Sequence, residues 1–202
     1  MPLPTPIKDI CMMIAEMPSF SDKGAERFLE WWWQRSKEEQ KKFALSWEKF
    51  THFSQCNKCS YFAEESLCEF CSNPKRNKKN ICVVVSPFTA YLIDKETDYQ
   101  GLFFVLNREL GRAKRSNNLE YFQKKAVFLK ERINKENIEE IILATDFTSS
   151  GEATALFLRE NLEDIPSKIT RLAQGFHIGD SLTYSDPTTL KVAFERRNIL
   201  NK

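Results

Sequence analysis

The chain has 202 residues, with 30 Lys and Arg against 28 Asp and Glu, and its formal net charge is +2. Hydrophobic residues make up 42% of it, which excludes an intrinsically disordered chain. The nearly balanced charge is unlike that of strongly basic nucleic-acid binders, so any such role must depend on local patches. No stretch approaches the ~20 apolar residues of a membrane span, and the N-terminus lacks a signal-peptide pattern. We therefore expect a folded, cytoplasmic protein that does not enter a membrane.

The first 55 residues have a helical pattern. Ile7, Ile10 and Ile14 recur at the spacing of one helix face. A second helix is predicted to begin near Ser21 or Asp22, and a third after Ser36, where Ser36 to Glu39 fits a capping box. Residues 31–33 are all Trp, and at ~100° per residue they cannot all face one core. We expect at least one of them at the surface or at an interface.

From residue 80 onward, apolar β-branched runs alternate with helical patterns. The runs 81–85, 102–106, 141–144 and 169–173 predict strands. Ser86 and Pro87 are an N-cap and a first-turn proline for a short helix. Longer helices are predicted over the segment with Leu119, Phe122 and Ile133 on one face, over 152–162 and over 187–197. This alternation predicts an α/β module with a parallel sheet.

Two C-x2-C pairs stand in sixteen residues and predict a metal site. Four thiolates at this spacing complete the tetrahedral shell of a structural Zn2+ and leave no position for a substrate water. A redox dithiol or unbound cysteines are the alternatives. His52 precedes the first pair but is not needed as a ligand. The predicted ligands are Cys56, Cys59, Cys68 and Cys71.

Three further motifs give the sequence a resemblance that covers almost the whole chain. They are 140–146 (EIILATD), 151–155 (GEATA) and 170–175 (TRLAQG). With the cysteine loop before them, they resemble the bacterial recombination-mediator family RecR. The resemblance implies an α+β multi-module fold with a helix-hairpin-helix domain at 1–55, a zinc finger and basic linker at 56–79, a Toprim domain at 80–165 and a C-terminal segment at 166–202 that swaps between subunits.

The resemblance also implies partners and a function. Family members form dimers and ring-shaped tetramers around DNA, single- or double-stranded, without sequence preference. They act with RecO and RecF to help load RecA at single-strand gaps. We therefore expect a DNA-binding, homo-oligomeric protein of DNA repair, associated with the bacterial nucleoid.

The hairpin departs from the family pattern at two positions. Ser19 and Ser21 replace glycines, and glycine is the residue that most easily lets backbone amides approach phosphate. Lys23 and Arg27 occupy the family's basic positions and share one helix face, so they are the expected phosphate contacts. The alternatives are two solvated charges, or an adaptor that has lost DNA binding.

The carboxylates of a catalytic Toprim domain are incomplete. Such domains hold Mg2+ with a Glu after the first strand and an Asp-x-Asp after a later one. Here Val85 takes the Glu position, and Thr148 replaces the second Asp after Asp146. We expect no catalysis, with Asp146 and Glu152 either capping the local structure or contacting a protein partner. The alternative is a Mg-dependent nuclease or primase-like enzyme that uses these two carboxylates.

A second basic region lies at residues 108–132, where eight Lys and Arg stand against three Asp and Glu and give +5. Its loop carries Arg108 and the expected DNA contacts Arg112, Lys114 and Arg115. The linker cations Lys75, Arg76, Lys78 and Lys79 are predicted to extend this area. A ring of subunits would repeat each patch and concentrate its charge.

Overall fold

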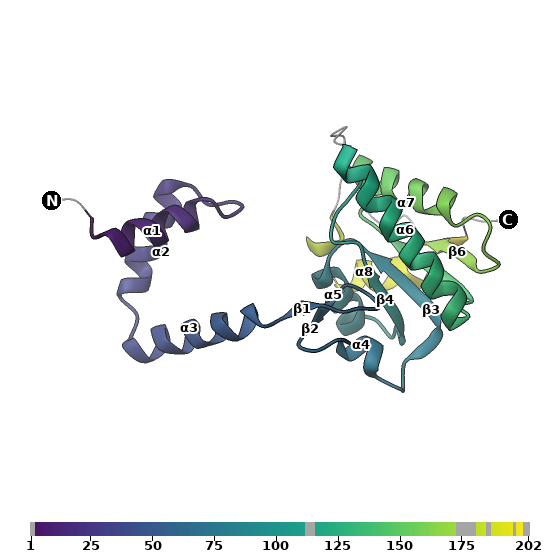
Figure 1. Cartoon of the computed structure of the whole chain (residues 1–202), viewed down its shortest axis with the longest axis horizontal. Helices are drawn as coiled ribbons and strands as arrows, with labels where there is room; N and C mark the ends of the chain where they lie inside the picture. Colours follow the sequence, from purple (N-terminus) through teal and green to yellow (C-terminus); the bar gives the residue numbers. More distant parts are fainter. Residues whose placement is uncertain (1–2, 112–115, 173–180, 185–186, 196, 200–202) are drawn as a thin grey trace. The chain divides into compact units, whose positions relative to one another are not determined.

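The protein is described from a computed structural model, which covers residues 3–111, 116–172, 181–184, 187–195 and 197–199. The chain forms two compact units, Met1–His52 and Phe53–Lys202, and each is described by itself (Figure 1). Within the described residues, no helix combines the length and the apolar character that crossing a membrane requires.

The N-terminal unit consists of helices α1 (Thr5–Ala15), α2 (Asp22–Trp33) and α3 (Lys37–Thr51). Ser21 caps α2 by accepting a hydrogen bond from the Gly24 amide at 3.3 Å. Ser36 and Glu39 form both bonds of a capping box at the start of α3. Both predicted helix starts are therefore confirmed.

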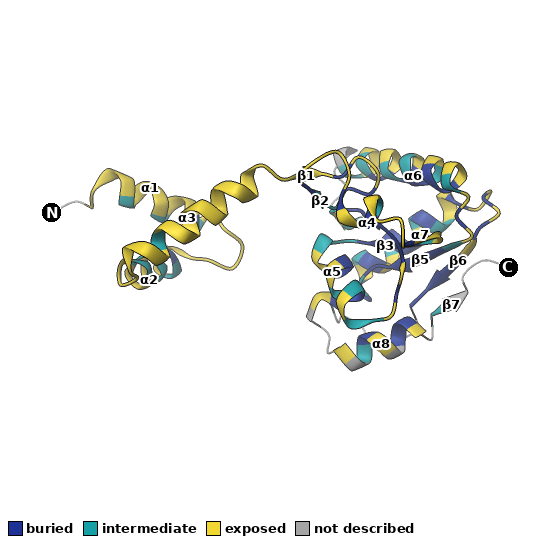
Figure 2. Ribbon diagram, turned by 90° about the horizontal axis from the view of Figure 1, so that it is seen from below, coloured by how far each residue is buried: buried dark blue, intermediate teal, exposed yellow. Residues whose placement is uncertain are grey.

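The N-terminal unit buries very little of its apolar surface, as the exposed faces in Figure 2 show. Among its described residues only Ile14 and Ala25 are buried, and α3 has no buried residue. Trp31 and Trp33 are exposed, at 47% and 75%. Trp32 is half-buried against Phe43, with 4.9 Å between the ring centroids. The expectation that the Trp run cannot be buried as a whole is confirmed.

The second unit is built on a five-stranded sheet of order β4-β3-β5-β6-β7. The strands are β3 (Asn77–Val84), β4 (Gly101–Val105), β5 (Glu140–Ala144), β6 (Lys168–Arg171) and β7 (Asn198–Ile199). The first four are parallel, as predicted, and β7 is antiparallel to β6. Sequence reasoning missed the two-residue β7, and it placed residues 77–79 in a linker although they begin β3.

Both faces of the sheet are covered. Alternate residues of β3 point to opposite sides: Ile81 and Val83 contribute to one core, Cys82 and Val84 to the other. The first core is closed by α6 (Ser116–Glu136) and α7 (Ser149–Asn161). The second is closed by α5 (Pro87–Glu96), the 3-10 turn Leu182–Tyr184 and α8 (Pro187–Glu195). Leu119, predicted on the buried face of α6, is exposed in its first turns.

The cysteine loop completes the cover on the second face. It contains β1 (Ser54–Gln55), its antiparallel partner β2 (Phe62–Ala63) and the short helix α4 (Glu69–Ser72). Phe70 of α4 stacks against Phe103 of β4, with ring centroids 4.8 Å apart. Three of the four clustered cysteines belong to the same buried core. The loop is thus part of the α/β unit.

An ion pair fixes the end of the chain to the sheet. Arg197 donates from Nε and Nη2 to the two carboxylate oxygens of Glu140, both at 2.9 Å. Thr170 of β6 donates to the same carboxylate at 3.0 Å. Burial opposes ionisation, but these hydrogen bonds and the Arg197 charge hold the pKa of Glu140 below its ordinary value. The pair anchors the segment after α8 beside β5 and β6.

We predict that Arg197→Gln destabilises the second unit by about 1–3 kcal/mol at pH 7, because it leaves a largely buried carboxylate with one neutral donor. The folded-state pKa of Glu140 is depressed, so its contribution is present above the unfolded pKa and is lost as pH falls. Thermal unfolding of both proteins from pH 7 to pH 3 measures this, and their difference should shrink at acid pH. A difference that does not depend on pH would contradict the assignment.

Candidate metal centre and carboxylate site

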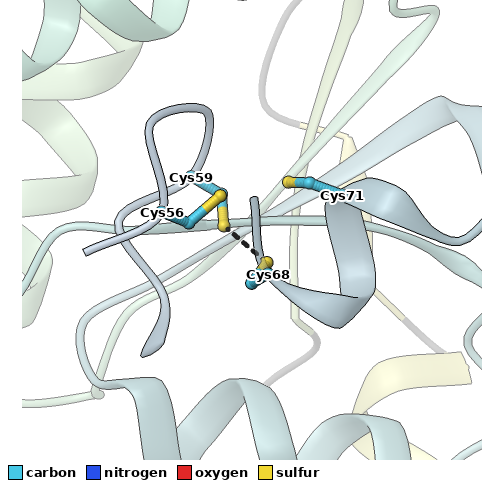
Figure 3. Close-up of side chains that lie close together, drawn as sticks. All are labelled: Cys56, Cys59, Cys68 and Cys71. Carbon is cyan, nitrogen blue, oxygen red and sulfur yellow. Dashed lines mark hydrogen bonds between the residues drawn. The ribbon is translucent and has the colours of Figure 1, made fainter. Parts of the chain in front are cut away.

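The structure brings the four predicted cysteines together (Figure 3). Their Sγ atoms all lie within 4.8 Å of one another, and those of Cys59 and Cys68 are 3.3 Å apart. Cys56 and Cys59 come from the turn between β1 and β2, while Cys68 and Cys71 flank the first turn of α4. Among the described residues, this is the one group of three or more Cys, His, Asp or Glu side chains close enough to hold a metal ion.

The donor set fits a tetrahedral metal ion. Zn–S bonds of about 2.3 Å place tetrahedral sulfurs about 3.8 Å apart, close to the spacing found here. Cys56, Cys59 and Cys68 are at most 2% exposed, so water cannot act as a fifth ligand from their side. Mutual hydrogen bonds lower the pKa of Cys56 and raise that of Cys59 and of Cys71, so the four thiols titrate as one coupled group. His52 is the exposed C-cap of α3.

Three consecutive carbonyls fasten the first cysteine turn to the α/β core. The carbonyl of Lys58 accepts from Arg132 at 3.0 Å, that of Cys59 from the Val105 amide at 2.7 Å, and that of Ser60 from Asn107 at 3.2 Å. Ser60 has a left-handed φ of 61°, which turns its carbonyl toward this contact. Sequence spacing found the ligands but missed these anchors, which come from distant segments.

Asp146 lies where β5 ends, at the carboxyl edge of the parallel strands. Its Oδ1 accepts from the Leu182 amide at 3.2 Å and its Oδ2 from the Ser181 hydroxyl at 3.3 Å. Both oxygens therefore hold the segment that leads into α8. The N-cap of α7 is Thr148, which accepts from the Gly151 amide at 3.1 Å, so a helix-capping role for Asp146 is not what the structure shows.

Glu152 lies in the first turn of α7 and forms an ion pair with Arg171 of β6. The Arg171 side chain is 9% exposed and also donates to Thr145 Oγ1 at 2.9 Å. Burial lowers the pKa of this guanidinium, and the Glu152 charge opposes the shift. About half of the Glu152 side chain stays exposed at the surface. The sequence analysis did not identify Arg171 as the partner of Glu152.

A third carboxyl group lies near Asp146. Burial and the Asp146 charge raise the pKa of Glu109, and its Oε1 atom is buried without a hydrogen-bond partner. Glu109 is a glutamate, but it follows β4, so its position does not match that of the missing Glu after β3, where Val85 stands. The three acidic residues at this edge therefore differ in state. Asp146 accepts from the Leu182 amide, Glu152 is paired with Arg171, and Glu109 has a raised pKa.

Of the five expected DNA contacts, the structure describes two. Lys23 and Arg27 are exposed on α2, and Arg27 Nε donates to the Lys23 carbonyl at 3.2 Å. Ser19 has a φ of 68°, so it adopts the left-handed conformation that glycine favours in this turn. Arg112, Lys114 and Arg115 lie outside the described residues.

Some of the cations counted as basic surface are internal. Arg76 is 9% exposed and pairs with Asp94, and Arg132 is 5% exposed. Lys125 donates to Ser60 Oγ at 2.6 Å, and burial lowers its pKa. The count of +5 for residues 108–132 therefore overstates the charge available to phosphate, and Arg76 does not belong to a phosphate-binding area.

Four parallel strands flanked by helices, with acidic residues at their carboxyl edge and a four-cysteine loop on one face, are the arrangement expected of a Toprim domain joined to a small cysteine loop. A Toprim domain model matches residues 79–173. The chain is 31% identical over 197 residues, 96% of its length and 94% of the relative's, to Recombination protein RecR of Roseiflexus castenholzii. It is 37% identical over 142 residues, 70% of each chain, to Recombination protein RecR of Methylococcus capsulatus. The chain belongs to the RecR family.

Proposed function

We propose that this protein is a recombination mediator of DNA repair that binds DNA as an oligomer and has no catalytic activity. Near full-length similarity to proteins named for recombination supports the role. A non-catalytic role is supported mainly by the bonds that two acidic side chains already make within the protein. Asp146 accepts hydrogen bonds from Ser181 and Leu182, and Glu152 forms an ion pair with Arg171. A Mg2+ ion needs several carboxylate oxygens free to face it.

DNA contact is assigned to the hairpin and to the loop before α6. Lys23 and Arg27 are exposed and four residues apart on α2, which suits them to adjacent phosphates. Arg112, Lys114 and Arg115 supply the second contact. Since all of these contacts are with phosphate, binding to single or double strands has no sequence preference and weakens with salt. A protein with this role would act on chromosomal DNA, in the bacterial cytoplasm and at the nucleoid.

Oligomerisation is supported by the N-terminal unit, because many of its large apolar side chains are exposed when this unit is considered by itself. Three helices with two buried residues do not form a stable core, and such patches mark interaction surfaces. A homodimer, and a tetrameric ring built from it, would cover them. Among the described residues of this unit, the most exposed large apolar side chains are Leu3, Met12, Met13, Trp33, Trp47 and Phe50.

The domain limits 1–55, 56–79, 80–165 and 166–202, and the subunit swap of the last segment, stay predictions.

Partner binding is assigned to the carboxyl edge of the sheet. The exposed half of Glu152, with Asp146 beside it, presents acidic groups on rigid elements, which suits a basic surface of RecO or RecF. Loading of RecA would follow from this contact indirectly. The metal is assigned as structural Zn2+, held by Cys56, Cys59, Cys68 and Cys71, since four thiolates leave no open position.

The purified protein is expected to contain one zinc ion per chain. Cys59→Ser should lower the zinc content below half and destabilise the second unit, because it removes one of four ligands from a buried site. Cys82→Ala is the matched control, since Cys82 is fully buried but lies outside the cluster. Metal analysis by atomic emission measures the content. Wild-type protein with no zinc, purified without chelators, would contradict the assignment.

DNA affinity should fall about tenfold or more at low salt in the double variant Lys23→Ala, Arg27→Ala, and the salt dependence of binding should become shallower by about one to two units of log–log slope. Fluorescence anisotropy with a labelled oligonucleotide, single- or double-stranded, measures both. Lys41→Ala, Lys42→Ala removes the same charge from exposed positions of α3 and is the control. Equal losses in the two variants would show that only net charge matters.

The competing function is a Mg-dependent phosphodiester enzyme, which the proximity of Glu109 and Asp146 favours. We expect no cleavage of single- or double-stranded DNA with Mg2+ or Mn2+. The assay compares wild type with Asp146→Ala, purified in the same way. Cleavage by the wild type that disappears in the variant would overturn the proposal, whereas a trace that persists in the variant is a contaminant.

A further inference from the structure

One buried arginine connects the metal centre with the α/β core. Arg132 extends from α6 and is 5% exposed. Its Nη1 donates to the carbonyl of Lys58 at 3.0 Å and to that of Phe103 at 2.9 Å. The first carbonyl belongs to the first cysteine turn, and the second belongs to β4. The guanidinium therefore joins the loop to the sheet.

The same guanidinium reaches the second cysteine pair. Its Nη2 donates to Cys71 Sγ at 3.6 Å, within the distance expected for an N–H···S bond. Nε donates to Glu136 at 3.1 Å, and Glu136 in turn pairs with Lys58 at 2.9 Å. The planar fork of arginine serves all four acceptors at once, which the point charge of a lysine cannot do.

We propose that Arg132 is a positioning residue of the metal centre. It donates to the Cys71 thiolate, and it holds both cysteine pairs against β4. The proposal rests on the occupancy of the cysteine site by zinc. Four thiolates around one Zn2+ have a net charge of −2, and three of the four side chains are buried. A cation buried beside them offsets this charge, and second-shell partners of this kind fix the orientation of metal ligands.

A consequence follows for the way in which metal loss affects the protein. An independent finger can unfold while the domain beside it stays intact. Here Cys56, Cys59, Cys68 and Phe70 share a core with β3 and β4, and Arg132 of α6 donates to both the loop and β4. Loss of the metal should therefore lower the unfolding temperature of the whole second unit rather than release a separate loop.

The test measures metal retention in full-length protein. Arg132→Met should release zinc to a chromophoric chelator about 10–100-fold faster than the wild type, the usual cost of losing a second-shell partner. Arg132→Lys should give an intermediate rate, since a lysine keeps the charge but cannot serve every acceptor. Lys130→Met is the matched control, because Lys130 lies on the same helix but pairs with exposed Asp164. It should release zinc at the wild-type rate.

A second readout separates the sulfur contact from a general loss of stability. In protein loaded with Co2+, the thiolate-to-cobalt absorption band should shift in Arg132→Lys, because the hydrogen bond to Cys71 changes. Lys130→Met should leave the band in place, because Lys130 lies on the same helix but pairs with exposed Asp164. If Arg132→Met does not fold, the Arg132→Lys spectrum and release rate still decide the question.

The outcomes distinguish this inference from the zinc assignment. Wild-type protein without bound metal would refute the zinc site and the inference together. Wild type that holds zinc, with release from Arg132→Met and Arg132→Lys at the control rate and an unchanged cobalt band, would refute only the role of Arg132. Chelation that leaves the unfolding transition of the second unit unchanged would refute the coupling between metal and sheet.

Discussion

The second unit depends on one constraint: a parallel sheet whose central strands are apolar on both sides must be covered on both sides. On one face, two long helices are enough, because Phe122, Leu129 and Leu158 fill the space above the strands. On the other face, α5 and α8 are short, and the loop that contains the cysteines covers the region over β4 that they leave open. Removing parallel strands from water is strongly favourable, so this cover is needed for the fold itself.

Because the cysteine loop covers part of the sheet, a metal ion bound in it would also stabilise the hydrophobic core. The four-cysteine motif alone does not reveal this role. A loop with only two-residue strands and one turn of helix has little stability of its own. Bonds to a metal ion would close it. The carbonyls of Lys58, Cys59 and Ser60 fix it to the α/β core, and its own Phe70 packs against Phe103. The loop thereby becomes rigid enough to act as part of the hydrophobic core.

Much of the fold was predictable because the information is local. Periodicity located the helices and strands, and the caps at Ser21, Ser36 and Ser86 fixed three helix starts. The metal ligands were predictable because their spacing is short. Strand β7 was missed since two residues have no pattern, and Leu119 was misplaced because periodicity gives a face but not what covers it.

Residues that act across long sequence distances could not be read from a pattern. Arg76, Arg132 and Arg171 look like surface cations in the sequence, yet each is buried with a carboxylate partner. A buried guanidinium is tolerated only where its donors are satisfied, and the acceptors come from other segments. Net charge is therefore a poor measure of the charge available to phosphate in this chain. It includes buried cations, and it does not show where the exposed cations lie.

In the N-terminal unit, helix caps are present but a buried apolar core is almost absent among the described residues. Its helices are capped well, by Ser21 and by the Ser36–Glu39 box, yet its aromatic side chains contact one another mostly in solvent. Caps contribute about 1 kcal/mol each, which is too little to fix three helices without a core. Trp31, Trp33 and Trp47 therefore need another surface to exclude water. If a second subunit provides it, the position of Lys23 and Arg27 on DNA is set by assembly, and the near-neutral chain gains its positive face only as an oligomer.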